Sequence, residues 1–301
     1  MPFDLLSRRS TLKTLAAAAA LALLGVPALA ASFESTRITV RTEGAGPDVV
    51  LIPGLNSSPR VWTEMLKAVP GYRYHLVQVS GFAGQPKGGN AEGPVAAPVA
   101  EEIDRYIKEA GLKQPAVIGH SMGGTIGMML AARHPADLSR LMVVDMVPFL
   151  GVFFGGPSAN AANIVPVADR IEAGMRAATP EDRSKRAVDT INSMVNTESM
   201  RAGAIEDSQR SDADVGTRAY RELIVTDLGP ELPKISVPVT VLYIQPKYVP
   251  VPVEHFDAGY KAAFAPVQKL TLKRVNDSAH FIMWDQPVRF QAEVKEFLGK
   301  R

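Results

Sequence analysis

The segment from Gly119 to Gly124 has the residue types of a site for nucleophilic catalysis. It reads Gly119-His120-Ser121-Met122-Gly123-Gly124 and matches the pattern Gly-x-Ser-x-Gly. A serine on a sharp strand-to-helix turn needs small residues two positions before and after it, because larger side chains would collide there. Such a turn lifts the serine hydroxyl above the sheet. We therefore interpret Ser121 as the candidate nucleophile, with an ordinary turn serine as the alternative.

The pattern by itself is weakly diagnostic, and the elements around it make it specific. An apolar run, Ala116-Val117-Ile118, comes directly before it and has the character of a buried strand. Met122–Arg133 follows and has the character of a helix. A strand before the serine and a helix after it are the context that this turn requires.

Acyl transfer also needs backbone N–H groups that face the developing negative charge, and each is typically worth about 2.7–4 kcal/mol of barrier. The N–H of Met122, which directly follows the candidate nucleophile, is one candidate. The second should come from a loop after an early strand, where the chain reads Ile52-Pro53-Gly54-Leu55-Asn56. We expect the N–H of Leu55 to serve, and a plain turn at Pro53-Gly54 is the alternative reading.

A general base must accept the proton of the serine hydroxyl. His280 lies between an apolar run that ends at Val275 and a helix-like segment that begins near Pro287. This location suits a base that comes last in the chain order serine, acid, histidine. His255 is the rival base, His120 is expected to support the serine turn, and His75 and His134 are expected to be structural or on the surface.

The acid that orients the base is the least specific part of the pattern. No carboxylate follows the strand-like run Val239–Ile244 directly, and Glu254 and Asp257 are the first acids downstream. Asp145 ends another buried strand-like run, Leu141–Val144, and a carboxylate there needs a partner. We favour Asp145 over Asp257 or Glu254; Asp277, or no acid at all, completes the alternatives.

Strand-like and helix-like stretches alternate along the chain, which predicts an α/β protein with a mostly parallel, doubly wound sheet. The strand-like runs are Thr36–Thr42, Asp48–Ile52, Tyr74–Val79, Ala116–Gly119, Leu141–Val144, Val239–Ile244 and Gln268–Val275. The helix-like stretches are Val61–Val69, Val99–Ala110, Met122–Arg133, Phe256–Phe264 and Val288–Leu298. Residues 149–234 interrupt the alternation and predict an inserted helical cap, so the core would comprise residues 32–148 and 235–301.

Together these features resemble the α/β-hydrolase superfamily over nearly all of the chain after residue 31. The matching segments are the Gly54 turn with Trp62 eight residues on, the loop Gly81-Phe82-Ala83-Gly84, the segment Gly119–Gly124 and the segment around His280. The resemblance implies an α/β-hydrolase fold and a Ser121, Asp145, His280 triad. Many relatives have histidine at the position of Pro53. Relatives with haloalkane dehalogenase or epoxide hydrolase chemistry carry aspartate in place of Ser121, which disfavours those reactions.

The composition excludes several other classes of protein. The chain has no cysteine, which rules out disulfides, thiolate metal sites and cysteine nucleophiles. Neither a metal-ligand cluster nor a phosphate-binding or dinucleotide-binding glycine loop is apparent, so we expect no cofactor and no metal. Basic and acidic residues are equal in number after residue 31, which argues against a nucleic-acid partner.

Residues 1–31 resemble a bacterial export signal of the twin-arginine type. Arg8 and Arg9 precede an alanine- and leucine-rich run, and Pro27-Ala28-Leu29-Ala30-Ala31 supplies a small-x-small site, with cleavage expected after Ala30. Thr11 stands where that signal usually has phenylalanine, so the general secretory route is an alternative. We expect a periplasmic or secreted protein. A stable membrane anchor is not expected, because Gly25 and Pro27 interrupt the apolar run.

The sequence therefore predicts a serine hydrolase that cleaves a carboxylic ester of a small or medium apolar substrate through an acyl-enzyme. Two alternatives remain open at this point. The same residues could act on lactones or amides, or carry out cofactor-free perhydrolysis, because the serine turn does not distinguish these reactions. The chain could also be a non-catalytic binding protein that retains the fold, since an acid after Ile244 is missing. The sequence leaves the oligomeric state open.

Overall fold

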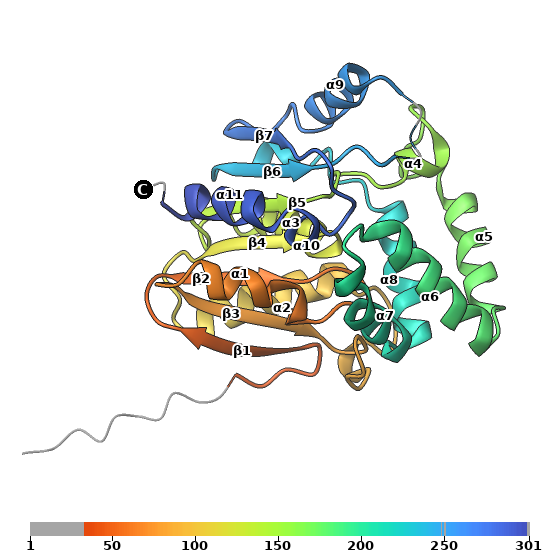
Figure 1. The fold of residues 1–301 in the computed structure, drawn as a ribbon, viewed down its shortest axis with the longest axis horizontal. Helices are drawn as coiled ribbons and strands as arrows, with labels where there is room; N and C mark the ends of the chain where they lie inside the picture. Colours follow the sequence, from red (N-terminus) through yellow and green to blue (C-terminus); the bar gives the residue numbers. More distant parts are fainter. Residues whose placement is uncertain (1–32, 248, 250, 300–301) are drawn as a thin grey trace, which may run out of the picture. The chain divides into compact units, whose positions relative to one another are not determined.

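A single twisted sheet organises the part of the chain that the computed structural model describes, residues 33–247, 249 and 251–299 (Figure 1). The strands stand in the order β1-β3-β2-β4-β5-β6-β7. β1 pairs antiparallel with β3, and every other neighbouring pair is parallel. Their bounds are Ile38–Gly44, Asp48–Ile52, Arg73–Val79, Ala116–His120, Arg140–Val144, Val239–Tyr243 and Leu270–Arg274 for β1 to β7 in turn. The expected export signal, residues 1–31, lies outside the described residues.

The central strands are apolar on both faces because helices cover both faces of the sheet. In β2, Val50 and Ile52 belong to one buried cluster, and Val49 and Leu51 belong to another. β4, β5 and β6 alternate between the same two clusters. Continuous apolar runs thus become strands that bury alternate side chains on opposite sides, as the sequence predicted.

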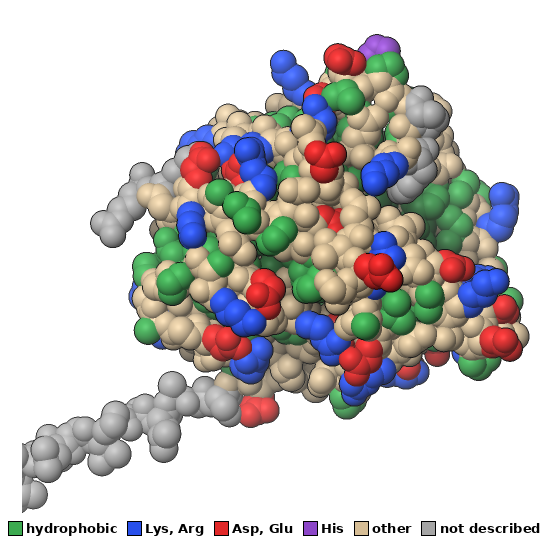
Figure 2. Space-filling model, in the orientation of Figure 1, with side chains coloured by type: hydrophobic (Ala, Val, Ile, Leu, Met, Phe, Trp, Pro, Cys, Tyr) green, Lys and Arg blue, Asp and Glu red, His purple; other side chains and the backbone are tan. Residues whose placement is uncertain are grey.

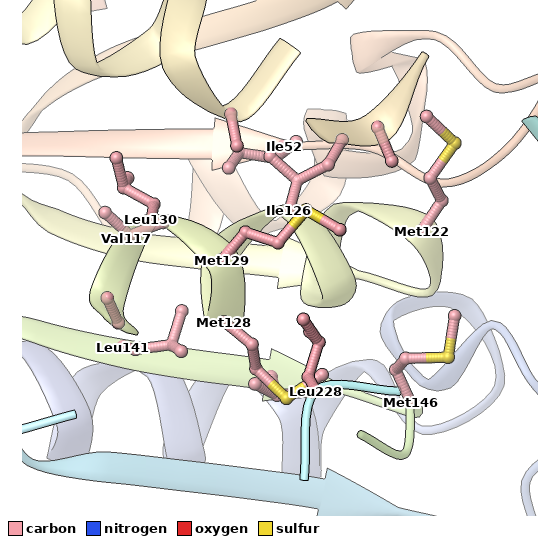
Figure 3. Close-up of a cluster of buried hydrophobic side chains, with 14 of the residues drawn as sticks. Ile52, Val117, Met122, Ile126, Met128, Met129, Leu130, Leu141, Met146 and Leu228 are labelled. Atoms are coloured by element: carbon pink, nitrogen blue, oxygen red, sulfur yellow. The ribbon is translucent and has the colours of Figure 1, made fainter. Parts of the chain in front are cut away.

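Helices α2 (Ala96–Glu109), α3 (Met122–Arg133) and α9 (Val253–Ala263) contribute buried residues to the first cluster. Helices α1 (Thr63–Ala68), α10 (Ile282–Asp285) and α11 (Pro287–Gly299) contribute to the second, with Trp62 stacked on Phe290. Figure 3 shows α3 directing Ile126 and Met129 into the first cluster beside Ile52 and Val117. The helix that follows the candidate nucleophile is thereby fixed to the sheet.

A helical insert separates β5 from β6. It contains α4 (Val152–Gly155), α5 (Val165–Arg176), α6 (Pro180–Met194), α7 (Arg201–Arg210) and α8 (Ala213–Val225), with short 3₁₀ turns at Glu198–Met200 and Leu232–Lys234. These helices gather beyond the carboxyl ends of the strands (Figure 1). The insert, which we call the cap, therefore lies at the edge of the sheet where the candidate site residues are found.

The strands and long helices outside the cap begin and end within three residues of their predicted bounds. α2 begins at Ala96, three residues before the predicted start. A side chain of the helical insert accepts hydrogen bonds from the N–H groups at this end of the helix. The Glu222 carboxylate accepts hydrogen bonds from the N–H groups of Val95, Ala96 and Ala97 at 2.5–2.9 Å. Of the described helices, none is long and apolar enough to span a membrane.

Candidate active site

Ser121 sits in a strained turn between β4 and α3. Its φ is +54° and its ψ is −122°, a conformation that costs a non-glycine residue energy and is typical of functional sites. Its N–H donates to the carbonyl of Val144 at 2.9 Å, and its own carbonyl accepts from the N–H of Gly124 at 2.7 Å. Backbone hydrogen bonds on both sides therefore hold the serine at the carboxyl end of β4.

The glycines of the Gly-x-Ser-x-Gly pattern are required by close backbone contacts. A Cβ atom at Gly119 would lie 2.0 Å from the carbonyl oxygen of Gly123, inside any allowed separation. A Cβ atom at Gly123 would lie 2.1 Å from the carbonyl oxygen of Ile52. The second contact also packs the serine turn against the loop that follows β2, which is the loop expected to supply an N–H donor.

That loop turns at Gly54–Ser57, where the N–H of Ser57 donates to the carbonyl of Gly54 at 3.2 Å. Asn56 has φ +54° at the third position of the turn, which favours asparagine or glycine. A Cβ atom at Gly54 would be only 3.1 Å from the Cβ of Ser121, so the loop lies directly against the serine. Among the described residues, no hydrogen bond engages the N–H of Leu55 or of Met122. Both amides thus lack an acceptor in the described part of the chain, and Met122 itself is buried.

Asp145 and His280 meet at the carboxyl edge of the sheet. The Nδ1 atom of His280 lies 2.6 Å from Oδ2 of Asp145, while Oδ1 accepts the N–H of Ile244 at 3.1 Å. Asp145 is 9% exposed and has φ +51°. Its N–H donates to the carbonyl of Leu242 at 2.7 Å. Both carboxylate oxygens are therefore bonded, and the carboxylate is oriented towards the imidazole.

The other acids named from the sequence have different surroundings. Asp257 accepts the hydroxyl of Tyr243 at 2.9 Å and pairs with Arg274 at 3.0 Å. Glu254 and Asp277 are exposed, as is the rival base His255. Of the candidate acids, the structure brings Asp145 alone into hydrogen-bond contact with His280.

His120 was expected to support the serine turn, and the structure shows the bond through which it connects this turn to His280. Its ring is fully buried, and its Nε2 lies 3.0 Å from the carbonyl oxygen of His280, which requires that Nε2 carries the proton. The rings of His120 and His280 are 4.6 Å apart between centroids. Burial holds the pKa of His120 well below its ordinary value, so the ring is neutral. His120 thus ties the serine turn to the backbone of His280.

His75 and His134 lie away from this edge, as expected. His75 is buried between the hydroxyl of Tyr106 and the carboxylate of Asp48 at the opposite ends of the strands. His134 pairs with Glu101 at the surface.

Ser121 and His280 are both partly exposed, so solvent or a ligand can reach them. In the described part of the chain, no hydrogen bond joins the Ser121 hydroxyl to the His280 ring. Catalytic contacts of this kind often tighten only when substrate is bound. The site therefore consists of a bonded aspartate–histidine pair beside a strained serine and two amides that have no acceptor among the described residues.

One group of side chains among the described residues has the spacing of metal ligands, and it lies away from this site. It comprises Asp104, His134 and Asp137 at the ends of α2 and α3. The ammonium group of Lys108 lies 2.6 Å from Asp104 and 3.3 Å from Asp137 and forms an ion pair with each carboxylate. The group is therefore accounted for as an ion-pair network.

The fold and these residues place the protein in a known class. The sequence profile described as the alpha/beta hydrolase family matches residues 49–293, and the chain belongs to this family. The match covers the β2 loop, the serine turn, the cap and the His280 segment.

Relatives with curated names match over a shorter stretch. A pimeloyl-(acyl-carrier protein) methyl ester esterase of Aeromonas hydrophila is 34% identical over 112 residues, which are 37% of this chain and 42% of that protein. The chain thus spans less than half the length of this relative.

Solved structures are similar over most of the chain. An esterase of Exiguobacterium antarcticum superposes with a TM-score of 0.72 at 19% identity, covering 87% of this chain and 96% of that chain. An enol-lactonase of Burkholderia xenovorans gives 0.71 at 17% identity with the same coverage. At these identities the likeness concerns the fold.

Proposed function

We propose that the protein is a serine hydrolase that cleaves a carboxylic ester of a small or medium apolar substrate. The observation that carries the proposal is the 2.6 Å contact between Asp145 and His280 beside the strained Ser121 turn. A buried carboxylate that holds the Nδ1–H of an imidazole leaves Nε2 unprotonated and able to accept a proton. The alternative of a non-catalytic protein rested on the missing acid after Ile244, and the Asp145 contact removes that reason.

In the first half of the reaction, Oγ of Ser121 attacks the ester carbonyl carbon while its proton passes to Nε2 of His280. Asp145 stabilises the imidazolium that forms. The N–H groups of Leu55 and Met122 donate to the oxyanion of the tetrahedral intermediate. The intermediate then collapses, the bond to the alkoxy oxygen breaks, and His280 returns the proton to the leaving alcohol.

In the second half, a water molecule attacks the acyl group on Ser121. Nε2 of His280 accepts a proton from this water, and the same two amides stabilise the second oxyanion. Collapse of this intermediate breaks the bond to Oγ, which takes the proton back from His280. The products are a carboxylic acid and the free enzyme.

The exposed apolar segment that follows Asp145 in the chain supports an apolar substrate. The chain continues from Asp145 into α4, where Phe153 is 51% exposed and Val152 and Phe154 are about one-third exposed. Hydrophobic side chains gather over the region of α4 in Figure 2. A methyl ester esterase among the relatives also favours ester chemistry. Lactone or amide hydrolysis and perhydrolysis would use the same residues and are outcomes of the test.

The test is hydrolysis of p-nitrophenyl esters from acetyl to dodecanoyl by the wild type and by Ser121→Ala. We expect turnover of the shorter esters by the wild type and its loss in the variant. Labelling with a fluorophosphonate, mapped to Ser121 by peptide mass, provides a readout that needs no substrate. A wild type that neither turns over any ester nor labels would contradict the proposal, whereas labelling without ester turnover would direct the search to lactones and amides.

We also propose that residues 1–31 direct export and that the protein works in the periplasm or outside the cell. The support is the order of Arg8-Arg9, the apolar run and the small-x-small site in the sequence. Expression in a bacterial host should give a mature chain that begins at Ala31. Replacing both arginines by lysine should retain the precursor if the twin-arginine route is used, and export unchanged by that replacement would indicate the general secretory route.

A further inference from the structure

The Asp285 carboxylate forms hydrogen bonds with two segments of the molecule. The proposed reaction requires a fixed position of each segment relative to the other. One is the base loop, Asn276–Phe281, which carries His280. The other is the cap corner, Met194–Met200, between α6 and α7. Asp285 accepts the N–H of Ala279 at 2.8 Å, and it also accepts the N–H groups of Asn196 at 3.1 Å and Thr197 at 2.8 Å.

Two more hydrogen bonds cross the same boundary. The N–H of Phe281 donates to the carbonyl of Met194 at 3.2 Å, and the hydroxyl of Thr197 donates to the carbonyl of Trp284 at 3.2 Å. Beneath them, Val195 is fully buried in the same apolar cluster as Phe281 and Trp284. The cap corner is therefore anchored to the residues on both sides of the base.

Among these contacts, the Asp285 carboxylate is the one group that forms hydrogen bonds with both the cap corner and the base loop. Thr197 begins the 3₁₀ turn at Glu198–Met200 but makes no side-chain capping bond. Asp285 supplies the missing cap from another part of the chain, as a negative charge at the start of a helical segment. The same carboxylate holds the N–H of the residue directly before His280, so displacement of the cap corner displaces the base loop.

We propose that Asp285 is a positioning residue that couples docking of the cap corner to the placement of the His280 imidazole. The proposal rests on the proposed function, in which His280 exchanges a proton with Ser121. His280 is held at its side chain by Asp145 and at its carbonyl by His120. Asp285 completes this support at the preceding peptide and connects it to the cap that covers the site.

The principal test is Asp285→Asn, with kinetics measured per active site after titration with a fluorophosphonate. We expect kcat to fall about ten- to a hundredfold, because small misplacements of a catalytic group have effects of this size. KM should stay within about twofold, because no substrate contact is removed. Asp285→Glu, which keeps a carboxylate, should recover much of the lost kcat.

Asp182→Asn is the matched control. Asp182 is also a capping carboxylate of the cap, bonded to Thr179 at the start of α6, and it has no contact with the base loop. We expect its kcat to be that of the wild type. Equal losses in the two variants, or an unchanged kcat in Asp285→Asn, would overturn the proposal while leaving the esterase assignment intact.

Amide hydrogen exchange tests the coupling without any substrate. In Asp285→Asn, exchange should accelerate about tenfold or more both at Asn196 and Thr197 and at Ala279, because each loses a charge-assisted hydrogen bond. If the variant does not fold, the wild type still provides a test, since these three amides should share one free energy of opening after correction for their intrinsic exchange rates. Acceleration confined to one segment, or different opening free energies in the wild type, would refute the coupling even if the protein proves to be no esterase.

Discussion

Asp145 reaches His280 across the end of an intervening strand. The two residues follow β5 and β7, and β6 lies between these strands in the sheet. The carboxylate bridges this gap by accepting the N–H of Ile244, the residue directly after β6, while it bonds the His280 ring. The place that an acid after β6 would occupy is thus filled from the neighbouring strand, which accounts for the lack of a carboxylate after Ile244.

Replacing Asp145 by asparagine should lower kcat by about four orders of magnitude. The amide cannot stabilise the imidazolium, and its NH₂ group favours the wrong tautomer of His280. Ester hydrolysis, with a fluorophosphonate titration of sites, measures the loss.

Asp257→Asn is the matched control, because it removes an acid that pairs with Arg274 and not with His280. Asp257 is 37% exposed at its side chain, so we expect kcat to be unchanged and the free energy of unfolding to fall by at most about 1 kcal/mol. The reverse pattern would transfer the acid role to Asp257.

The serine turn could be predicted from the sequence because its constraints are local. Glycine is required at position 119 because a Cβ atom there would collide with the backbone of the same turn. It is required at position 123 because a Cβ atom there would collide with the carbonyl oxygen of Ile52. The strands could be predicted for a similar reason. The apolar residues within a run such as Asp48–Ile52 themselves indicate a buried strand.

Contacts between distant segments could not be predicted in this way. The early start of α2 depends on Glu222, more than 120 positions away, and the cap of the turn at Glu198–Met200 depends on the carboxylate of Asp285. No local pattern marks either carboxylate as a helix cap. The acid was left open for the same reason, because the proximity of Asp145 to His280 arises only from the order of the strands.

Gly123→Ala should disrupt both the serine turn and the β2 loop. The added Cβ would lie 2.1 Å from the carbonyl oxygen of Ile52, and backbone atoms cannot yield cheaply. We expect a loss of about 1–3 kcal/mol in the free energy of unfolding, together with a lower kcat because the Leu55 amide moves. Urea unfolding and ester kinetics measure the two effects.

Gly174→Ala provides the comparison for that substitution. Gly174 lies within α5, and nothing stands within 4 Å of the position of an added Cβ. Alanine there should raise the free energy of unfolding by about 0.5–1 kcal/mol and leave kcat unchanged. Equal free energies of unfolding in the two variants would show that the backbone around Gly123 shifts to accommodate the added Cβ atom with little loss of stability.

Glu222→Ala should destabilise the junction between α8 and α2. Three N–H groups at the start of α2 would lose their acceptor, and we expect the free energy of unfolding to fall by about 2–3 kcal/mol. Glu101→Ala removes an exposed carboxylate of the same helix that pairs with His134, and it should cost less than about 1 kcal/mol. Comparable losses in the two variants would mean that the three bonds to Glu222 contribute little.

His120 should make the stability of the protein depend on pH. Burial is the main cause that lowers the pKa of its ring, and the nearby His280 lowers it further. The unfolded chain therefore binds a proton at this position below about pH 6.5, where the folded protein does not. Because the unfolded state then binds more protons, the free energy of unfolding falls as the pH decreases, by up to about 1.4 kcal/mol per pH unit, and this contribution is constant above that range.

His120→Gln isolates this contribution, because glutamine can still donate to the carbonyl of His280 but does not titrate. Urea unfolding at pH 8 and at pH 5 should show a smaller fall in stability for the variant than for the wild type. Part of the fall should remain, because burial also lowers the pKa of His75. The comparison at pH 8 corrects for any change in packing, since both chains carry a neutral side chain there. An identical fall in the two proteins would mean that His120 is protonated in the folded state. The conclusion that a neutral His120 ring donates to the carbonyl of His280 would then be wrong.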